Sequence, residues 1–150
     1  MKNKVIVPDV LLQPHNASLE LTFYESSQFP QEYRDDIFAS EHGSRNRSVR
    51  AGYEVIRVLM NHSGRASGSY EDFLTGFVVD NGHVWGRPVG VTVAQDGSLL
   101  ITDDGSNSIC RVIFSGASVQ KNNSVEKNSH RAGNLSLEAL AGSTQSRREE

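Results

Sequence analysis

The fold class is decided by residues 89–114, VGVTVAQDGSLLITDDGSNSICRVIF. This stretch contains three short apolar runs, at 89–94, 98–103 and 108–114. Residues 95–97 (QDG) join the first two runs and residues 104–107 (DGSN) join the next two, and both linkers consist of residues that enter tight turns at low steric cost. Short apolar runs with such linkers predict three consecutive antiparallel β-strands.

Upstream of this stretch, the same pattern predicts four further strands, at 18–24, 36–42, 52–59 and 71–79. In the first of them Leu19, Leu21 and Phe23 alternate with polar residues, which is the period of two expected of a half-buried strand. Gly76 interrupts the fourth, and a glycine inside a strand indicates a β-bulge or a close backbone approach.

The two groups of strands resemble each other. Three segments of the first group correspond in order to three of the second: 19–24, 37–41 and 53–58 to 89–94, 99–103 and 109–112. Repeated antiparallel units of four short strands are typical of β-propeller blades. The sequence provides one complete blade and three strands of another, whereas a closed propeller needs at least about four blades. The predicted fold is therefore all-β, a partial β-propeller of about two antiparallel blades.

The C-terminal segment differs in composition. Residues 118–150 contain no Phe, Trp or Tyr and few aliphatic side chains, so they bury too little apolar surface to offset the entropy of ordering a backbone. We expect a disordered polar tail, in which LSLEALAG could form a turn or two of helix. The predicted organisation is an N-terminal extension at 1–13, a partial sugar dehydrogenase β-propeller at 14–117 and the tail at 118–150.

Composition excludes several classes of function. Fifteen Lys and Arg against eighteen Asp and Glu give a net charge of -3, so sequence-independent binding to nucleic acid is not expected. No apolar run approaches the roughly 20 residues that cross a bilayer, and the N-terminus has no recognisable export signal, which favours a cytoplasmic protein if expressed as written. Cys110 is the sole cysteine and is expected to be a small buried apolar residue.

Four segments carry a resemblance to a known family: HNASLELTFY, FPQEYRDDIFASEHGSRNRS, GYEVIRV and EDFLTGFVVDNGHVWGRPVG. Over residues 14–114 the chain resembles the C-terminal part of the PQQ-dependent sugar dehydrogenases, the glucose/sorbosone dehydrogenase family of six-bladed propellers. The resemblance implies a periplasmic or secreted quinoprotein oxidoreductase. Such a protein oxidises a sugar and passes its electrons to pyrroloquinoline quinone (PQQ), usually with a calcium ion beside the quinone.

The resemblance also implies which residues bind the cofactor. PQQ carries three carboxylates, which guanidinium groups recognise in pairs, and Arg87 before the strand at 89–94 resembles such a contact. Gly86 and Gly90 would let the backbone approach the ligand. The loop HGSRNRS adds His42 and Arg47 as candidate contacts. For all three candidates a purely structural role, bonding loop carbonyls, remains open.

One residue departs from the family pattern, and the metal ligands are not defined by the sequence. Arg45 stands where the family has a tryptophan in an HGSWNR-like motif, which changes the specificity of the site or puts it in doubt. Asp103 and Asp104 could ligate calcium, but an Asp before Gly-Ser-Asn is also ordinary turn chemistry. The remaining histidines show no metal-ligand spacing, so the metal ligands stay unknown.

Two functions of different class follow. In the family the catalytic base and much of the quinone pocket come from blades N-terminal to this region, so no catalytic residue is assigned here. The first hypothesis is a C-terminal fragment of a PQQ-dependent sugar dehydrogenase, inactive unless another chain supplies the missing blades. The alternative is a small β-rich interaction module without enzymatic activity, which pairs with a partner by strand addition.

Overall fold

The computed structural model describes residues 5–80, 83–116 and 135–140, the last of these by backbone path and pairing. These residues form ten β-strands and one short 3-10 helix, η2 (Gln31–Tyr33), with no α-helix among them. The all-β prediction is confirmed. Within this described part of the chain, no helix has the length and apolar character needed to cross a lipid bilayer.

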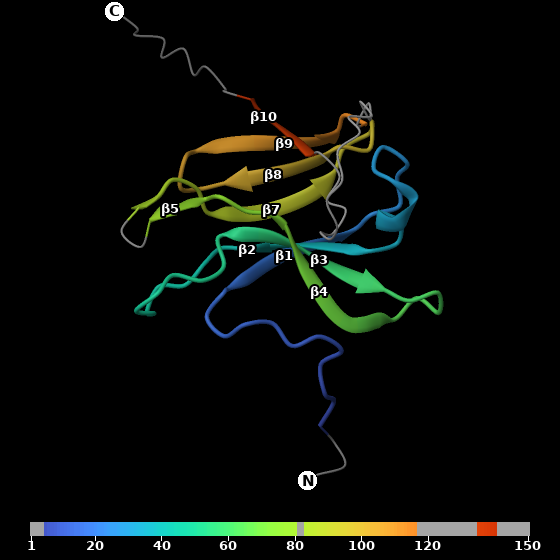
Figure 1. The fold of residues 1–150 in the computed structure, drawn as a ribbon, viewed down its shortest axis with the longest axis horizontal. Helices are drawn as coiled ribbons and strands as arrows, with labels where there is room; N and C mark the ends of the chain where they lie inside the picture. The colour runs from blue at the N-terminus through green and yellow to red at the C-terminus, as the bar shows by residue number, and fades with distance from the viewer. Residues whose placement is uncertain (1–4, 81–82, 117–134, 141–150) are drawn as a thin grey trace, which may run out of the picture.

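Two four-stranded antiparallel sheets lie in two layers, one above the other (Figure 1). In the first sheet, blade 1, strand order follows the chain: β1 (Ser18–Phe23), β2 (Ile37–Glu41), β3 (Glu54–Met60) and β4 (Ala66–Leu74). Blade 2 has the same order: β7 (Pro88–Val93), β8 (Leu99–Asp103), β9 (Ser108–Phe114) and β10 (Leu135–Leu140). Between the blades the chain forms a two-stranded ribbon of β5 (Val78–Asp80) and β6 (His83–Val84). The predicted partial propeller of two blades is confirmed.

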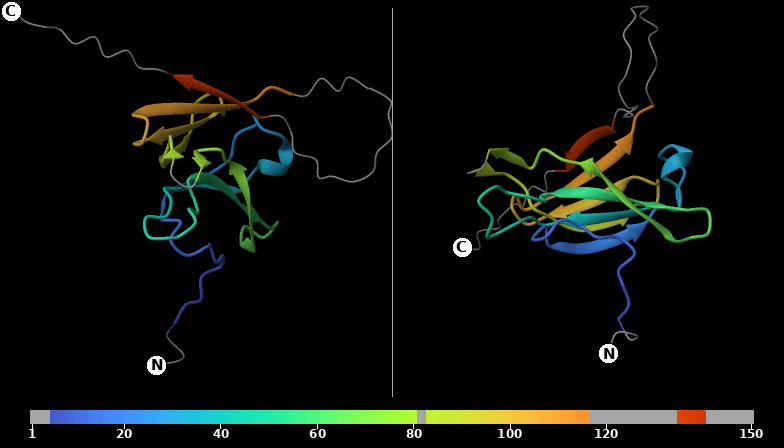
Figure 2. Two further views of the ribbon diagram at one scale, coloured as in Figure 1. Left: turned by 60° about the vertical axis from the view of Figure 1, so that its left-hand side comes forward. Right: turned by 60° about the horizontal axis from the view of Figure 1, so that its bottom comes forward.

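The first strands of the two blades, β1 and β7, lie next to each other, and β2 also contacts β7 (Figure 2). Among the polar contacts at this junction, the Ser40 hydroxyl of β2 donates to the Val89 carbonyl of β7 at 2.5 Å. The two blades are therefore joined along their innermost strands, as neighbouring propeller blades are.

The main core lies between the blades. Side chains of blade 1 and of the loop after β1, three of them aromatic, pack there on non-aromatic side chains of blade 2: Tyr24, Phe29, Phe38 and Val55 against Val91, Leu99, Ile101, Cys110 and Val112. The Tyr24 and Phe29 rings stack at 4.7 Å between centroids, and Phe38 meets Tyr24 edge-on at 5.7 Å. Cys110 is a free, buried thiol in this core, as predicted.

The opposite face of blade 1 differs from the expectation for β1. Leu19, Leu21 and Phe23 do alternate along a strand, but they are 54%, 56% and 51% exposed. The predicted half-burial is wrong because these side chains point away from blade 2. Only a small cluster around Ala39, Ile56 and Val58 is buried on this face, together with part of the N-terminal segment.

The internal repeat extends to charged side chains. In blade 1 the Arg57 Nε donates to Asp36, which precedes β2, at 2.6 Å, and its Nη1 donates to Glu71 of β4 at 2.8 Å. In blade 2 Arg111 of β9 pairs with Asp96, which precedes β8. Register adds a further match, because Arg57 is opposite Glu71 and Arg111 is opposite Glu138. The two blades are thus copies of one structural unit.

The strand predicted at 71–79 is wrong in its limits. β4 begins at Ala66, directly after a tight turn in which the Asn61 Oδ1 accepts from the backbone N–H of Ser63 and Arg65 at 3.0 Å each. It ends at Leu74, and Gly76 with φ +98° turns the chain into β5 instead of forming a bulge within one strand. Positive φ is accessible to glycine at low cost, so Gly76 separates two elements.

Most of the predicted tail, 118–134 and 141–150, lies outside the described residues. Within the tail Leu135–Leu140 forms β10, antiparallel to β9 with Leu135 opposite Phe114 and Leu140 opposite Ile109. The helical turn expected for LSLEALAG is therefore wrong. An unpaired edge of β9 offers a row of backbone donors and acceptors, and pairing with it satisfies groups that a short isolated helix leaves exposed. β10 completes blade 2, for which the sequence predicted three strands.

We expect the Tyr24 hydroxyl to stabilise the interface between the blades. It donates to the Gly97 carbonyl at 2.9 Å and accepts from the Phe29 N–H at 2.8 Å, and the side chain is fully buried. Tyr24→Phe leaves both partners unsatisfied in the core, which should lower the free energy of unfolding by about 1–3 kcal/mol. Urea unfolding measures the change. Tyr70→Phe, at a half-buried tyrosine of β4, is the control and should change stability far less.

Candidate functional site

A pocket of about 810 Å³ opens where the loop after β2 meets the segments that enter β7 and β9. It combines cationic and aromatic side chains with small residues and backbone: His42, Arg45, Arg50, Tyr53 and Arg87 with Ala17, Gly43, Ser44, Val84 and Gly105. The ends of β2 and of the connection into β7 come together here because the blades pack along their innermost strands. Two of the three predicted ligand contacts, His42 and Arg87, therefore share one pocket.

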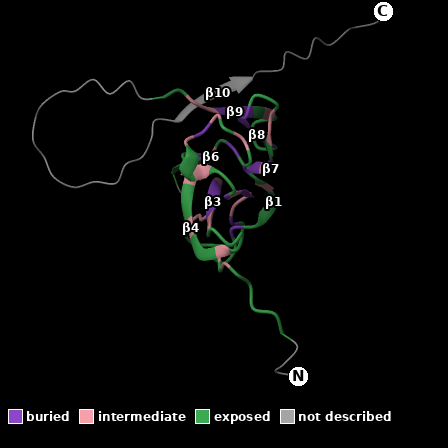
Figure 3. Ribbon diagram, turned by 90° about the vertical axis from the view of Figure 1, so that its right-hand side faces the viewer, coloured by how far each residue is buried: buried purple, intermediate pink, exposed green. Residues whose placement is uncertain are grey.

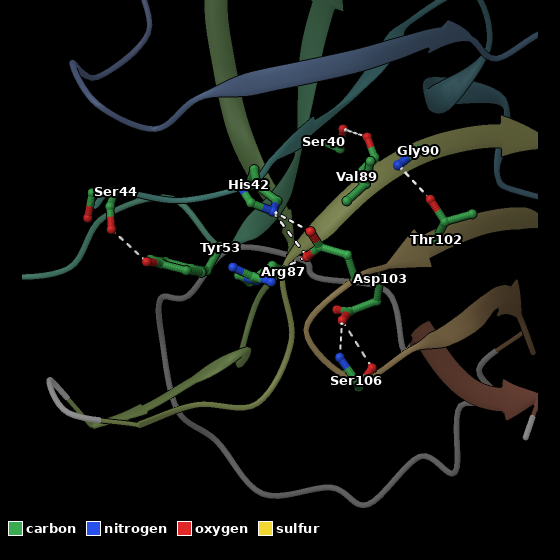
Figure 4. Close-up of polar contacts among 11 residues, drawn as sticks. Ser40, His42, Ser44, Tyr53, Arg87, Val89, Gly90, Thr102, Asp103 and Ser106 are labelled. Atoms are coloured by element: carbon green, nitrogen blue, oxygen red, sulfur yellow. Dashed lines mark hydrogen bonds and ion pairs between the residues drawn. The ribbon is translucent and has the colours of Figure 1, made fainter. Parts of the chain in front are cut away.

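Asp104 links these two residues across the blade junction. Its carboxylate lies 3.1 and 3.2 Å from the His42 Nε2 and 3.0 Å from the Arg87 Nε (Figure 4). All three side chains are partly open to solvent, with exposures of 25% for His42, 44% for Arg87 and 49% for Asp104. The carboxylate thus occupies donors that an incoming anion could also use.

The loop that carries the cations is held by Tyr53. Its hydroxyl donates to the Ser44 carbonyl at 2.6 Å and accepts from the Arg50 Nη1 at 3.0 Å. The ring packs directly on Gly43, which has φ +104°, so any side chain at position 43 would overlap it. The Ser44 N–H and the Ala51 carbonyl close the loop at 2.8 Å. Residues 44–51 are thereby fixed as a short arch over the pocket.

The pocket carries more positive than negative charge. Three guanidinium groups line it, from Arg45, Arg50 and Arg87, and Asp104 is the carboxylate paired with one of them. Within the described residues Arg45 makes no ion pair, and it is exposed at the rim. Guanidinium groups recognise planar carboxylates with two parallel hydrogen bonds, so this arrangement suits an anionic ligand that bears carboxylates.

Arg47 does not join this group. It is exposed, and its Nη1 donates to the Pro14 carbonyl at 3.3 Å, on the side of the loop away from the pocket lining. The sequence analysis did not single out Arg50 and Tyr53. The order of the strands could have indicated them. Arg50 and Tyr53 come just before β3 and His42 comes just after β2, and in antiparallel neighbours the end of one strand lies beside the start of the next.

The two adjacent aspartates have separate roles. Asp103 is buried, and its Oδ1 accepts from the Ser106 N–H at 2.7 Å and hydroxyl at 3.0 Å, which is the turn chemistry of one predicted alternative. Its Oδ2 is buried without a hydrogen-bond partner. No group of three or more His, Cys, Asp or Glu side chains among the described residues is arranged to hold a metal ion. The geometry at Asp103 and Asp104 is that of a turn and an ion-pair network.

Two glycines beside the pocket are required by close contacts within the chain. A side chain at Gly86 would overlap the Asp103 carboxylate and the Phe77 ring. One at Gly90 would come within 2.8 Å of the Thr102 hydroxyl, which also accepts from the Gly90 N–H. The absence of a side chain at Gly86 and Gly90 therefore makes room for side chains of the chain itself; approach of a ligand to this backbone stays a prediction.

An acidic cluster lies behind the pocket, where β2 and β3 pair at Glu41 and Glu54. Glu41 is fully buried; it accepts from the Ser18 hydroxyl, while its Oε2 has no partner, and burial raises the pKa of its carboxyl. Burial, followed by the charge of Asp72, a hydrogen bond to Asp72 and the charge of Glu41, raises the pKa of Glu54 to about 7. The fold therefore favours the protonated form of Glu54.

This cluster predicts a dependence of stability on pH. The pKa of Glu54 is about 7 in the folded protein against 4.5 for the unperturbed group, so the folded state binds more protons than the unfolded state between these values. Stability should fall as pH rises from 4.5 to 7 and then level off with respect to this group. Glu54→Gln removes that loss, so the variant should gain stability relative to wild type at pH 8 and much less at pH 5.

Urea unfolding at the two pH values measures the difference. Glu25→Gln, at an exposed glutamate after β1, serves as the control. An equal effect of Glu54→Gln at both pH values would contradict the assignment.

Two repeated four-stranded antiparallel units that pack along their first strands, with a cationic pocket at the strand ends, define a segment of a β-propeller. Comparison with known proteins gives its family. The chain belongs to the TrAA12-like family, whose model matches residues 2–115.

The relatives and neighbours found are longer than this chain. An uncharacterized protein of Borreliella burgdorferi is 39% identical over 114 residues, which are 75% of this chain and 30% of that protein. The calcium structure of a Trichoderma reesei enzyme of Carbohydrate-Active Enzymes family AA12 superposes with a TM-score of 0.57 at 23% identity, over 71% of this chain and 27% of the other.

The holo form of the PQQ domain of Coprinopsis cinerea pyranose dehydrogenase is a further structural neighbour. It superposes with a TM-score of 0.54 at 27% identity, over 72% of this chain and 29% of that one. The chain therefore spans about 30% of the length of the curated relative that it matches.

Proposed function

We propose that this chain forms one wall of the quinone-binding cleft of a PQQ-dependent sugar oxidoreductase, of the glucose/sorbosone dehydrogenase type. The observation that carries the proposal is the pocket at the blade junction, where His42, Arg45 and Arg87 converge on one space. Membership of the TrAA12-like family supports it, as does the structural likeness to a PQQ domain.

The residues present fit such a cofactor. PQQ bears three carboxylates and two quinone carbonyls, and the pocket offers guanidinium forks from Arg45 and Arg87 together with the imidazole of His42. Arg50, fixed by Tyr53, adds a third guanidinium to the lining. When bound, the quinone supplies the acceptor for the two electrons that a sugar loses on oxidation. The residues of this chain bind and orient the anion.

The chain's share of the reaction is binding, and we assign no catalytic base to it. The imidazole in the pocket, His42, is hydrogen-bonded to Asp104 through its Nε2. Further blades, from a longer polypeptide or another chain, would supply the base and the opposite wall. The resemblance implies a calcium ion beside the quinone. The ligands of that ion would have to include groups outside the described residues of this chain.

Arg87→Ala tests the binding site. Loss of a charge-assisted hydrogen bond removes about 1.5–3 kcal/mol, so the Kd for PQQ should rise roughly 10- to 100-fold. Equilibrium dialysis with PQQ, with and without calcium, measures it for the chain alone and for the chain mixed with one that carries the N-terminal blades. Arg65→Ala, at an exposed arginine in the turn before β4, is the control. Arg47→Ala in the same series tests the third predicted contact.

Absence of PQQ binding by the wild-type chain, both alone and in the mixture, would reject the proposal. It would leave the β-rich interaction module as the remaining function. Unchanged affinity in Arg87→Ala with intact wild-type binding would reject the site alone.

Asp104→Asn has the opposite expected effect. Its carboxylate occupies the Arg87 Nε at 3.0 Å and the His42 Nε2 at 3.1 Å, so it competes with an incoming carboxylate and offsets the positive charge of the pocket. The variant should bind PQQ several-fold more tightly than wild type, with a steeper loss of affinity as salt is raised. Dialysis at two salt concentrations measures both effects. Weaker binding would instead show that Asp104 is needed to orient the two donors.

A further inference from the structure

The outward face of blade 1 leaves apolar surface uncovered. Leu19, Leu21 and Phe23 of β1 are each more than half exposed, and β1 is drawn largely in the colour of exposed residues in Figure 3. A groove of about 360 Å³ runs beside them, between β1 and the segment that carries Val10 and Leu12. Contiguous apolar surface of this kind marks interaction sites.

The internal repeat indicates which kind of surface covers this face. Register places Leu21, Ala39 and Ile56 in one cross-strand row on the outward face of blade 1. The equivalent row of blade 2 is Val91, Ile101 and Cys110. In blade 2 this row is at most 2% exposed, because blade 1 covers it. In blade 1 Leu21 is 56% exposed, whereas Ala39 and Ile56 are buried beneath Val10 and Leu12 of the N-terminal segment. The outward face of blade 1 is therefore the counterpart of a face that a neighbouring blade covers, and its β1 edge is left open.

The covering surface is also repeated within the chain. The face that blade 1 turns toward blade 2 carries the row Thr22, Phe38 and Arg57. The equivalent row of blade 2 is Thr92, Leu100 and Arg111, and it lies on the outward face. Beside it Ile109 is 45% exposed. One chain thus presents both halves of a blade interface, one on each of its outer faces.

We propose that this chain binds a second copy of itself head to tail, with the outward face of blade 2 on one copy covering the outward face of blade 1 on the next. The contact repeats the arrangement of blade 1 on blade 2 within the chain. It is heterologous, and a heterologous contact closes into a ring when its repeated rotation adds up to a full turn, as the rotation between propeller blades does, and otherwise extends into a filament. Propellers have about four to eight blades, so two-bladed copies would close as two, three or four chains.

This inference extends the proposed function, because it names a source of neighbouring blades, but it rests on the two faces alone. Assembly is measured without PQQ, so its failure leaves the proposed cofactor site untouched. Failure of PQQ binding likewise leaves the assembly intact.

Light scattering coupled to size-exclusion chromatography measures the mass of the full chain over a range of concentrations. We expect wild type to have the mass of two to four copies. Leu21→Asp on blade 1 and Ile109→Asp on blade 2 should each yield monomers, because a carboxylate buried in an apolar contact weakens association at least about 100-fold. Val79→Asp, at a 71% exposed valine of β5, is the matched control and should leave the assembly unchanged.

Mixing the two variants gives the sharpest test. The Leu21→Asp copy keeps an intact blade 2 face and the Ile109→Asp copy keeps an intact blade 1 face. Their 1:1 mixture should therefore form a heterodimer and nothing larger. A symmetric contact between two blade 1 faces would give a different result, with Ile109→Asp still dimeric and no rescue in the mixture.

Three results would overturn the proposal: a monomeric wild type at every concentration, assembly of Ile109→Asp like wild type, or a mixture that stays monomeric. Leu19→Asp provides a second variant of the same face, at a side chain exposed enough to leave the fold unstrained. Urea unfolding of each variant verifies that loss of assembly does not reflect loss of folding.

Discussion

The rest of the structure depends on one constraint, which is that a four-stranded sheet with apolar side chains on both faces cannot bury both by itself. Blade 1 meets this constraint on one side by packing Phe38 and its neighbours on Ile101 and Val112 of blade 2. This contact orders the long loop after β1, because the Tyr24 hydroxyl within it bonds the turn of blade 2 at Gly97. Every feature of the site therefore depends on the burial of side chains between the blades.

The pocket is a consequence of that packing and not of any single loop. His42 follows a strand of blade 1 and Arg87 precedes a strand of blade 2, so neither blade holds the pair alone. Asp104 then joins them. Its carboxylate accepts from both residues, so the His42 imidazole and the Arg87 guanidinium can lie close together without a bound ligand. A ligand with several carboxylates, as in the proposed function, would compete with Asp104 for these donors.

Much of the fold could be predicted from local patterns, because short apolar runs and Asp-Gly turns act over a few residues. The site could be predicted only in part. His42 and Asp104 are 62 residues apart, and nothing local in the sequence relates them. β10 was missed because its pairing is decided by the open edge of β9, and the exposure of Leu21 was missed because alternation shows that a face is apolar without showing what covers it.

The same reasoning connects the pocket to the outer faces. If the rotation from blade 1 to blade 2 is repeated by further blades, the strands that begin at β1 and β7 line one side of a common axis, and the pocket beside Arg87 faces that axis. A wall of two blades then holds an anion weakly, since solvent reaches Arg87 and Asp104 freely. Each blade added around the axis excludes water from these charges and strengthens their pull on a carboxylate. Under the proposed function, affinity for an anionic cofactor and closure of the ring should therefore increase together.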